Sequence, residues 1–409
     1  MKYDFDNLAK RRHTSSLKWD VLDNELAMWV ADMDFKTPKF ITDKMKDIVE
    51  FSNFGYKNIP SSYFESYISW WNKRHNVKWD VSDMIFATGV VPAISSIVRK
   101  ITTVGEKVLV MKPCYNIFFN SIVNNGRFIL SSDLVYSNGE YSIDFKDLEE
   151  KLKDPQVNLM ILCNPQNPCG KIYTKEELEL IGKLAYENNV VVLSDEIHCD
   201  IVENGYNYVP FQSVNDINRY NSITCISASK CFSLAGLQGA CVVVPNKVLR
   251  HKVNRGLNTD EVAEANSFVC ETFKEAFNNG EEYITELNDY IANNKKYAYD
   301  YIKNNIPQLT PVISHSLYLI WVDISKVSDD SLKFCQFLRE KTGLYITEGS
   351  EYGECGKTFV RINLGTSLDY VKDGMERLKK GVELYVWWNF LYNISSNIYF
   401  SFSIFVPSC

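Results

Sequence analysis

Lys230 stands among small side chains, directly after an apolar run. Residues 223–226 of this run are rich in β-branched side chains and predict a buried strand that leads to the lysine. The flanking residues are almost all small: Ser227, Ala228, Ser229, Ala235 and Gly236. A bulky group could therefore lie against this backbone, within reach of a nucleophilic amine. Position alone does not decide this, because a lysine at a strand end is more often a solvated surface group.

Two other charged residues belong to apolar strands. Asp195 comes just after the aliphatic run at 190–193, where an unpaired carboxylate is costly to bury, so we expect it to have a cationic partner. A helix N-cap or an exposed strand end is the alternative for Asp195. Arg361 lies between Val360 and Ile362, and a guanidinium buried there needs an anionic partner, from the protein or from a substrate.

Candidate ligand-binding residues follow three further predicted strands. After the strand that begins at Met84, Gly89 and Val90 open a helix whose free amides could bind an anion, although Thr-Gly turns are common. Tyr115 follows the strand at 108–111, and Asn167 follows the strand at 157–163. In a parallel sheet the loops at the carboxyl ends of the strands form the functional edge, and both residues fall there.

These residue types suit pyridoxal phosphate. A lysine that bonds to this cofactor needs an anion site for the phosphate, an acid for the ring nitrogen and a donor for the phenolic oxygen. It also needs an aromatic face for the ring and a guanidinium for the substrate carboxylate. The chain offers all five.

The elements that must position these residues alternate between strands and helices. A capping box at Thr174 and Glu177 opens a helix between the strands at 157–163 and 190–193, which predicts a mostly parallel sheet covered by helices. A long tyrosine-rich helix at 281–304 leads to a second unit, with strands at 317–324 and 359–364 and a helix at 331–342. We therefore expect an α/β chain with two domains.

Composition excludes several classes of function. The chain has 409 residues and a net charge of −7 without a basic block, which argues against nucleic acid and against a polybasic membrane patch. Eleven cysteines contain no Cys-x-x-Cys pair and the start has no apolar signal segment, so we expect a cytoplasmic protein. The five histidines are too scattered for spacing to predict a metal site.

The motifs around these residues resemble those of fold type I pyridoxal phosphate enzymes. Within that class the chain resembles the MalY/PatB branch of carbon–sulfur lyases, the cystathionine β-lyase type. Two motifs single out that branch, Trp29-Val-Ala-Asp-Met-Asp-Phe35 and Asp195-Glu-Ile-His198. Taken alone, the first motif is better explained as a strand edge before a helix that begins near Pro38 than as a pair of catalytic acids. The likeness covers roughly residues 1 to 383.

The resemblance implies roles around the cofactor. Lys230 holds pyridoxal 5'-phosphate, Asp195 pairs with the ring nitrogen, Asn167 donates to the phenolic oxygen and Tyr115 stacks on the ring. His198 stands near the phenolic oxygen, where aminotransferases more often have a tyrosine. The phosphate is held by Gly89, Val90 and Ser227 or Ser229.

The resemblance also implies the assembly. Arg361 binds the substrate carboxylate, and Tyr56 reaches the partner's site in a homodimer. The implied fold is aspartate-aminotransferase-like, with a large domain at 46–285 that carries the mostly parallel sheet. Residues 1–45 and 286–383 form the smaller α+β domain.

The implied reaction is β-elimination from cystathionine or a related cysteine S-substrate, which yields a thiol, pyruvate and ammonia. An aminotransferase is the alternative, because the cofactor residues alone fit both reactions. A regulator-binding protein with residual lyase activity is a further alternative. Three departures from the branch, Gln166, Lys171 and Cys231, put fine specificity in doubt.

The tail at 384–409 lies outside this pattern. Residues 384–406 carry no charge, and 16 of these 23 are apolar or aromatic while seven are Asn or Ser. An additional end with little function, a segment packed on a dimer and a membrane anchor all remain open, with a membrane role the less favoured. Residues 398–404 partly alternate, as in a strand.

Overall fold

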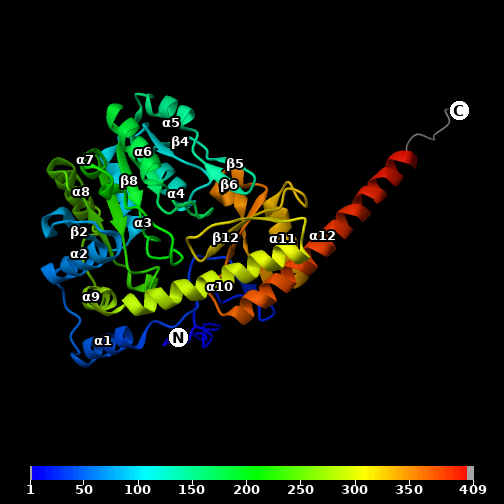
Figure 1. Ribbon diagram of the computed structural model, residues 1–409, viewed down its shortest axis with the longest axis horizontal. Helices are drawn as coiled ribbons and strands as arrows, with labels where there is room; N and C mark the ends of the chain where they lie inside the picture. The colour runs from blue at the N-terminus through cyan, green and yellow to red at the C-terminus, as the bar shows by residue number, and fades with distance from the viewer. Residues whose placement is uncertain (1, 403–409) are drawn as a thin grey trace.

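Two sheets organise the chain (Figure 1). The computed structural model describes residues 2–402, of which residues 389 and 392–402 as backbone alone. The larger sheet has the strand order β2-β10-β9-β8-β7-β3-β4. Its strands are β2 (Met84–Ala87), β3 (Lys107–Val110), β4 (Phe128–Ser131), β7 (Val157–Cys163), β8 (Val191–Asp195), β9 (Ser222–Ile226) and β10 (Ala240–Val243). All neighbours pair in parallel except β10, which is antiparallel to β2 and β9, so the predicted mostly parallel sheet is confirmed.

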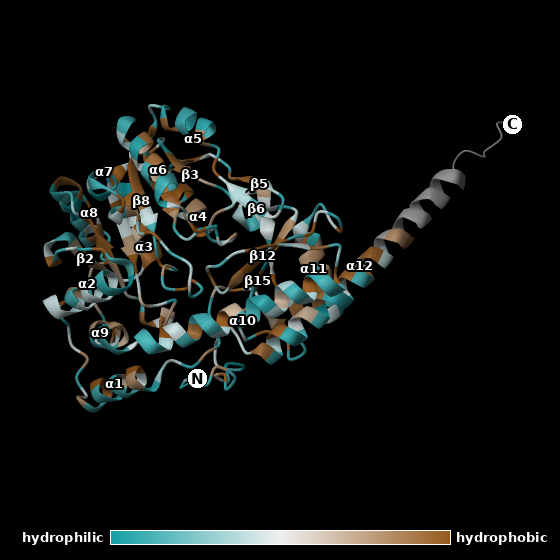
Figure 2. Ribbon diagram, viewed as in Figure 1, coloured by the Kyte–Doolittle hydropathy of each residue, from teal (hydrophilic) through white to brown (hydrophobic). Residues whose placement is uncertain are grey.

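Helices cover both faces of this sheet, which explains why its central strands are apolar throughout. Along β7, Leu159 and Ile161 belong to the core beneath α3 (Val90–Ile101), whereas Met160 and Leu162 belong to the core beneath α6 (Lys175–Glu187). Figure 2 shows this layered arrangement, with hydrophobic residues concentrated in the strands and hydrophilic residues on the outer helix surfaces. The remaining elements on this side are α2 (Ser61–His75), α4 (Ile117–Val123), α5 (Phe145–Leu152), α7 (Asp216–Tyr220), α8 (Lys247–Thr259), α9 (Val269–Asn279), β5 (Val135–Ser137) and β6 (Glu140–Ser142).

The smaller sheet is antiparallel, with the order β11-β12-β15-β14. Its strands are β11 (Thr310–Val312), β12 (Leu319–Asp323), β14 (Thr347–Glu348) and β15 (Phe359–Asn363), and α11 (Ser331–Thr342) packs beside them. The predicted bridging helix is α10 (Glu281–Asn305), which extends from α9 toward this sheet (Figure 1). Near the N-terminus, β1 (Leu26–Ala27) pairs with β13 (Leu344–Tyr345), and α1 (Lys39–Glu50) begins after Pro38 and packs on α9.

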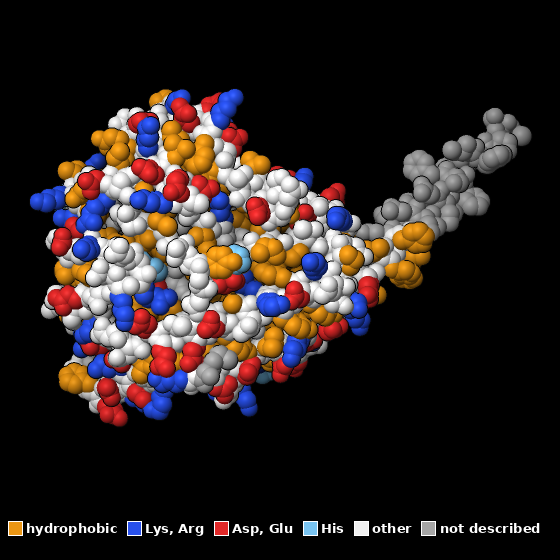
Figure 3. Space-filling model, in the orientation of Figure 1, with side chains coloured by type: hydrophobic (Ala, Val, Ile, Leu, Met, Phe, Trp, Pro, Cys, Tyr) orange, Lys and Arg blue, Asp and Glu red, His pale blue; other side chains and the backbone are white. Residues whose placement is uncertain are grey.

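The last helix, α12 (Leu368–Phe402), leaves the body of the molecule (Figure 1). Tyr385 is its last buried side chain among the described ones, and it packs against Phe334 and Phe337 of α11. Beyond it, Trp387 and Phe390 are exposed, and hydrophobic side chains are visible where α12 departs (Figure 3). Residues 398–402 are helical, so the strand-like alternation was misleading there, and 403–409 lie outside the described residues. Of the helices described, none has the length and apolarity needed to cross a membrane.

The cysteines are free in the described part of the chain. Ten are described, nine of them buried and Cys355 half-buried. Three of the ten, Cys163, Cys225 and Cys241, lie in strands, and the others lie in helices or irregular segments. Their burial is typical of a small hydrophobic residue.

Candidate active site

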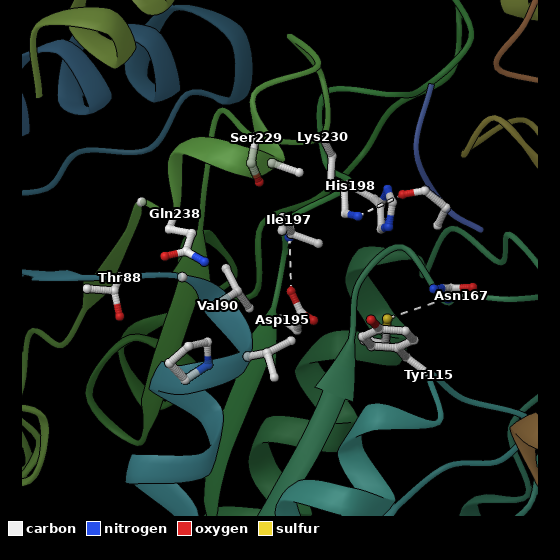
Figure 4. A pocket seen from close by; sticks show the side chains of 17 residues that line it. Thr88, Val90, Tyr115, Asn167, Asp195, Ile197, His198, Ser229, Lys230 and Gln238 are labelled. Carbon is white, nitrogen blue, oxygen red and sulfur yellow. Dashed lines mark hydrogen bonds between the residues drawn. The ribbon is translucent and has the colours of Figure 1, made fainter. Parts of the chain in front are cut away.

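A cavity of about 290 Å³ lies where the carboxyl ends of β7 and β8 meet the N-terminus of α3 (Figure 4). Parallel strands bring their carboxyl ends to one edge, so loops far apart in the sequence meet here. Eight of the predicted residues line its wall: Gly89, Val90, Tyr115, Asn167, Asp195, His198, Ser229 and Lys230. In the described part of the chain, Ser227, Tyr56 and Arg361 are not on this wall.

Lys230 projects into the cavity from the irregular segment after β9. Its Nζ donates to the carbonyl oxygen of Ala31 at 2.7 Å. Burial lowers the pKa of Lys230 from its ordinary value, an effect that the negative charge of Asp32 opposes. A lowered pKa increases the fraction of neutral amine, which is the form that acts as a nucleophile or a base.

Asp195 is the last residue of β8, so it is not a helix N-cap. Its Oδ1 accepts a hydrogen bond from the Ile197 amide at 3.1 Å (Figure 4). Burial raises the pKa of Asp195 to about 7, against the lowering effects of that amide and of Lys230. The expected cationic partner is missing, because no ion pair joins Asp195 to any described residue. The wall therefore presents a buried carboxylate that needs a proton or a cation.

Arg361, in the middle of β15, is buried as predicted and lies just behind the wall. Its Nη1 donates to Asn167 Oδ1 at 3.2 Å and its Nη2 to the Trp29 carbonyl at 2.9 Å. Among the described residues it forms no ion pair, and its buried Nε has no hydrogen-bond partner. No carboxylate of a described residue lies within ion-pair distance of this guanidinium, which leaves the alternative of a substrate carboxylate. Because Arg361 uses the Asn167 oxygen, the Asn167 amide is oriented with its NH₂ group free to donate.

His198 is buried on the cavity wall, with its ring at 5.7 Å from the ring of Tyr318 in an edge-on arrangement. Burial lowers the pKa of His198 well below its ordinary value, and the positive charges of Lys230 and Arg361 act in the same direction. Its Nδ1 has no partner among the described residues. The imidazole is therefore neutral at pH 7 and can take part in hydrogen bonding but not in charge pairing.

Tyr115 is held by a loop that Gln166 supports. Gln166 Nε2 donates to the carbonyls of Met111 and Pro113 at 2.9 and 2.7 Å, and its Oε1 accepts from Tyr173 at 2.8 Å. Gln166 is one of the departures from the MalY/PatB pattern, and these bonds give it a clear structural role. Lys171, another departure, forms an ion pair with Glu177 at 2.8 Å. Both departures support loops of the site rather than its wall.

The turn before α3 forms one end of the cavity together with Ser229. Gly89 has φ of +152° and ψ of +161°, a conformation that is accessible essentially to glycine alone. Ser229 is on the wall, whereas the buried Ser227 is behind it and donates to the Gly239 carbonyl at 2.7 Å. Since Ser227 Oγ lies 2.9 Å from Ser229 Oγ, it supports its neighbour instead of facing the cavity.

Sequence reasoning missed several residues at or near this site, four of which bear on the position of Lys230 or on the phosphate end of the cavity. Thr88, Gln238 and Ala31 line the cavity, and Tyr318 lies behind Ala31 and His198. Gln238 has a positive φ of 54°, which places it in a tight turn eight residues after Lys230. Its type and spacing carry no signal of their own. Ala31 contributes a main-chain carbonyl, for which no residue type is diagnostic.

Tyr56 is far more exposed than the other predicted residues. Its side chain is fully solvent-accessible, with an exposed fraction of 100%, on the loop between α1 and α2. It therefore contributes nothing to the cavity wall of its own chain in the described structure.

One cluster outside the cavity has metal-ligand residue types. Ligand atoms of His75, Cys199 and Asp200 lie within 4.8 Å of one another. Asp200 already accepts hydrogen bonds from Trp70 and Arg74 at 3.0 Å, and lies 3.2 Å from His75 Nε2. The cluster is thus accounted for as a buried polar network around one carboxylate.

Comparison with known proteins agrees with this geometry. Residues 28–378 match the family model of class I and II aminotransferases. The chain belongs to this family. It is 35% identical to the cystathionine β-lyase PatB of Bacillus subtilis, over 92% of this chain and 99% of PatB. It is 28% identical to protein MalY of Escherichia coli, over 92% of this chain and 98% of MalY.

A solved structure supports the same relationship. Cystalysin from Treponema denticola, which contains a pyridoxal 5'-phosphate cofactor, superposes with a TM-score of 0.91 at 28% identity, over 94% of this chain and 99% of cystalysin. The resemblance to the MalY/PatB branch and the aminotransferase-like fold are thereby confirmed. The cofactor of this family member is pyridoxal 5'-phosphate.

The residues present fit that cofactor. Asp195 offers a buried carboxylate that forms no ion pair with any described residue, which suits a protonated ring nitrogen. Gly89 allows the chain to approach an anion closely at the start of a helix. Lys230 is on the same wall, within the same cavity (Figure 4).

Proposed function

We propose that this chain is a carbon–sulfur β-lyase that cleaves cystathionine or related cysteine S-substrates to a thiol, pyruvate and ammonia. The observation that carries the proposal is 35% identity to a protein named cystathionine β-lyase, across nearly the whole of both chains. The similarity to cystalysin, at a TM-score of 0.91, supports it. Arg361 lies behind the cavity wall beside Asn167 and forms no ion pair with a described residue, which suits an amino-acid carboxylate.

The roles we assign follow from the contacts described above. Lys230 would hold the cofactor covalently, Asp195 would keep the ring nitrogen protonated and Asn167 would donate to the phenolic oxygen. Tyr115 would cover the ring, and His198 would lie near the phenolic oxygen as a neutral group. The phosphate would be bound by Gly89, Val90 and Ser229, with Ser227 in support.

Catalysis then depends on a proton transfer by Lys230. When bound, pyridoxal phosphate supplies an electron sink for a negative charge at the substrate Cα. Arg361 would bind the carboxylate and so present the Cα–H bond to Lys230. The amine of Lys230, whose pKa burial lowers, would take the Cα proton and so permit the sulfur to leave Cβ. With one water, the products are the thiol, pyruvate and ammonia.

The second candidate is an aminotransferase. The matching family model is named for aminotransferases, and the residues that hold the cofactor suit both reactions. In the lyase a group leaves Cβ and the amino nitrogen is released as ammonia, whereas in the aminotransferase no group leaves Cβ and the amino nitrogen is passed to a 2-oxo acid.

We further propose a cytoplasmic homodimer. The free cysteines support the reducing compartment. The full exposure of Tyr56, on a loop with Phe54, supports a surface that a second chain covers, so that Tyr56 reaches the partner's cavity.

The test is turnover without an acceptor. The purified enzyme is expected to release pyruvate and ammonia from cystathionine, or sulfide from cysteine, over many turnovers with no 2-oxo acid present. Multiple turnovers that require an added 2-oxo acid would exclude the lyase and favour the aminotransferase. Lys230→Ala serves as the control, because it should lose the covalent adduct that borohydride traps. An adduct on another lysine would refute the site assignment.

A further inference from the structure

Main-chain oxygens anchor the whole Trp29–Val–Ala–Asp32 segment, and side-chain contacts of Trp29 and Asp32 add to them. The segment has no regular secondary structure, yet each of its four carbonyls accepts a side-chain hydrogen bond. Asn363 Nδ2 donates to the carbonyls of Val30 and Asp32, at 2.6 and 2.9 Å. Arg361 donates to the Trp29 carbonyl at 2.9 Å. The smaller sheet thus fixes the path of this segment past the cavity.

The third carbonyl, that of Ala31, is shared by two donors. Lys230 Nζ donates to it at 2.7 Å and Tyr318 Oη at 3.0 Å. A carbonyl oxygen has two lone pairs, so it can accept both bonds at once. The Tyr318 side chain is fully buried, and within the described chain its hydroxyl has no second partner. The Tyr318 hydroxyl therefore donates only to the Ala31 carbonyl oxygen, the same atom that accepts the hydrogen bond of the Lys230 amine.

The backbone around Tyr318 is fixed from both sides. Leu317, which precedes it, has φ of +63°, a left-handed conformation that is unusual for leucine, and its amide donates to the Ile201 carbonyl at 2.8 Å. The Tyr318 carbonyl accepts from the Leu364 amide at 2.7 Å. A Cβ at Gly365 would lie 3.2 Å from the Tyr318 ring and 2.7 Å from Met33, so only glycine leaves room for this packing. A strained residue held this firmly indicates that the position of Tyr318 matters.

We propose that Tyr318 is a positioning residue for Lys230, because its hydroxyl fixes the Ala31 carbonyl that receives the lysine amine. The inference rests on the role proposed for Lys230. That amine must leave the cofactor and return to it in each cycle, and it sits on a flexible four-carbon stem. A fixed acceptor limits where the free amine goes and keeps it directed at the reacting atom. Tyr318 is not on the cavity wall, so it acts through Ala31 and not on the substrate.

The test separates positioning from stability. The full-length holoenzyme is stripped of cofactor and then recharged with pyridoxal phosphate, and the rate of covalent capture by Lys230 is followed by absorbance. Binding of pyridoxamine 5'-phosphate, which has no aldehyde and cannot bond to the lysine, is measured in parallel. Tyr283→Phe is the matched control, because Tyr283 is buried and its hydroxyl has no partner among the described residues.

Tyr318→Phe is expected to slow capture and kcat by roughly tenfold, since a small misplacement of a reacting group is costly. Its affinity for pyridoxamine phosphate and its KM should stay within about twofold of the wild-type values, and its melting temperature within a few degrees. The Tyr283→Phe variant should match the wild type in all of these measurements, including the capture rate and kcat. An unchanged capture rate would overturn the inference. So would a slower capture that is matched by weaker analogue binding and a lower melting temperature. Capture that persists in Lys230→Ala would instead refute the assignment of the lysine.

Discussion

Asp195 shows most clearly how burial prepares a single residue for its role. The end of β8 places its carboxylate where burial raises its pKa to about 7, and no described cation neutralises it. A group of this kind is costly for the protein alone and favourable once a protonated ring nitrogen lies beside it. The buried Asp195 carboxylate therefore lowers the stability of the cofactor-free chain, and the same burial suits its proposed role beside the ring nitrogen.

Asp195→Asn is expected to lower turnover by several factors of ten while the fold is kept. An amide cannot hold a proton on the ring nitrogen, and each tenfold loss corresponds to about 1.4 kcal/mol in the barrier. Steady-state kinetics at saturating cofactor, with circular dichroism as a control for folding, measures this. Unchanged turnover would contradict the assigned role.

The same substitution should stabilise the cofactor-free protein at high pH. The folded-state pKa of Asp195 is raised above its unfolded value of about 4, so the folded state holds its proton more tightly and loses stability as pH rises from about 4 to about 7. The neutral amide of the Asp195→Asn variant would carry no such cost, and the gain at pH 8 is up to about 4 kcal/mol. Denaturant unfolding at pH 5 and pH 8 tests the sign, and parallel stability curves for variant and wild type would contradict it.

At the scale of elements, the turn from β2 into α3 is the proposed binding site of the cofactor phosphate. Its geometry depends on Gly89, whose φ of +152° other residues avoid, and on a helix whose first turn faces the cavity. An added Cβ at Gly89 would also lie 3.3 Å from Pro92 Cδ.

Gly89→Ala is therefore expected to lower the free energy of unfolding by about 1–3 kcal/mol and to weaken cofactor binding. Gly236→Ala is the matched control for stability, because a Cβ there meets nothing within 4 Å and its φ is not in the left-handed region. Chemical denaturation and cofactor titration measure the two effects. Equal stabilities for the two variants would contradict the strain argument.

Elements were easier to predict than contacts. The strand at 157–163 and the helix at 331–342 were predicted with the observed bounds, because apolar runs and caps are local signals. Lys230, Asp195 and Asn167 were predictable as site residues because strand ends gather at one edge. Ala31 and Tyr318 were not, since one acts through its carbonyl and the other reaches it from a distant strand. The sequence could not distinguish Ser229, which lies on the cavity wall, from Ser227, which lies behind it, because the two differ only in side-chain direction.

At the scale of the whole molecule, the two sheets each contribute a residue at or next to the cavity. Arg361 comes from the smaller sheet and Asp195 from the larger one, and α10 extends from α9 toward the smaller sheet. The division into domains at 45/46 and 285/286 remains a prediction. So does the homodimer, although the exposed Tyr56 loop gives it a direct test.

Mixing two inactive variants should restore activity if Tyr56 serves the partner's site. In a mixed dimer of Lys230→Ala and Tyr56→Ala chains, one site lacks both residues and the other keeps both. Random exchange of subunits then predicts roughly a quarter of the wild-type activity, from the symmetry of a two-fold dimer. The assay follows pyruvate after the variants are co-refolded. If Tyr56 acts within its own chain, the mixture stays as inactive as its parents.

The buried cysteines have a consequence for the chemistry that surrounds this protein. A lyase of this kind releases thiols and sulfide, which air converts into disulfides and persulfides that capture exposed thiolates. Burial raises the pKa of Cys163, on the cavity wall, and of Cys225 and Cys231 well above the ordinary value, so thiolate is scarce at neutral pH. A catalyst built this way resists modification by its own products, and it should keep its activity in aerated buffer without added reductant.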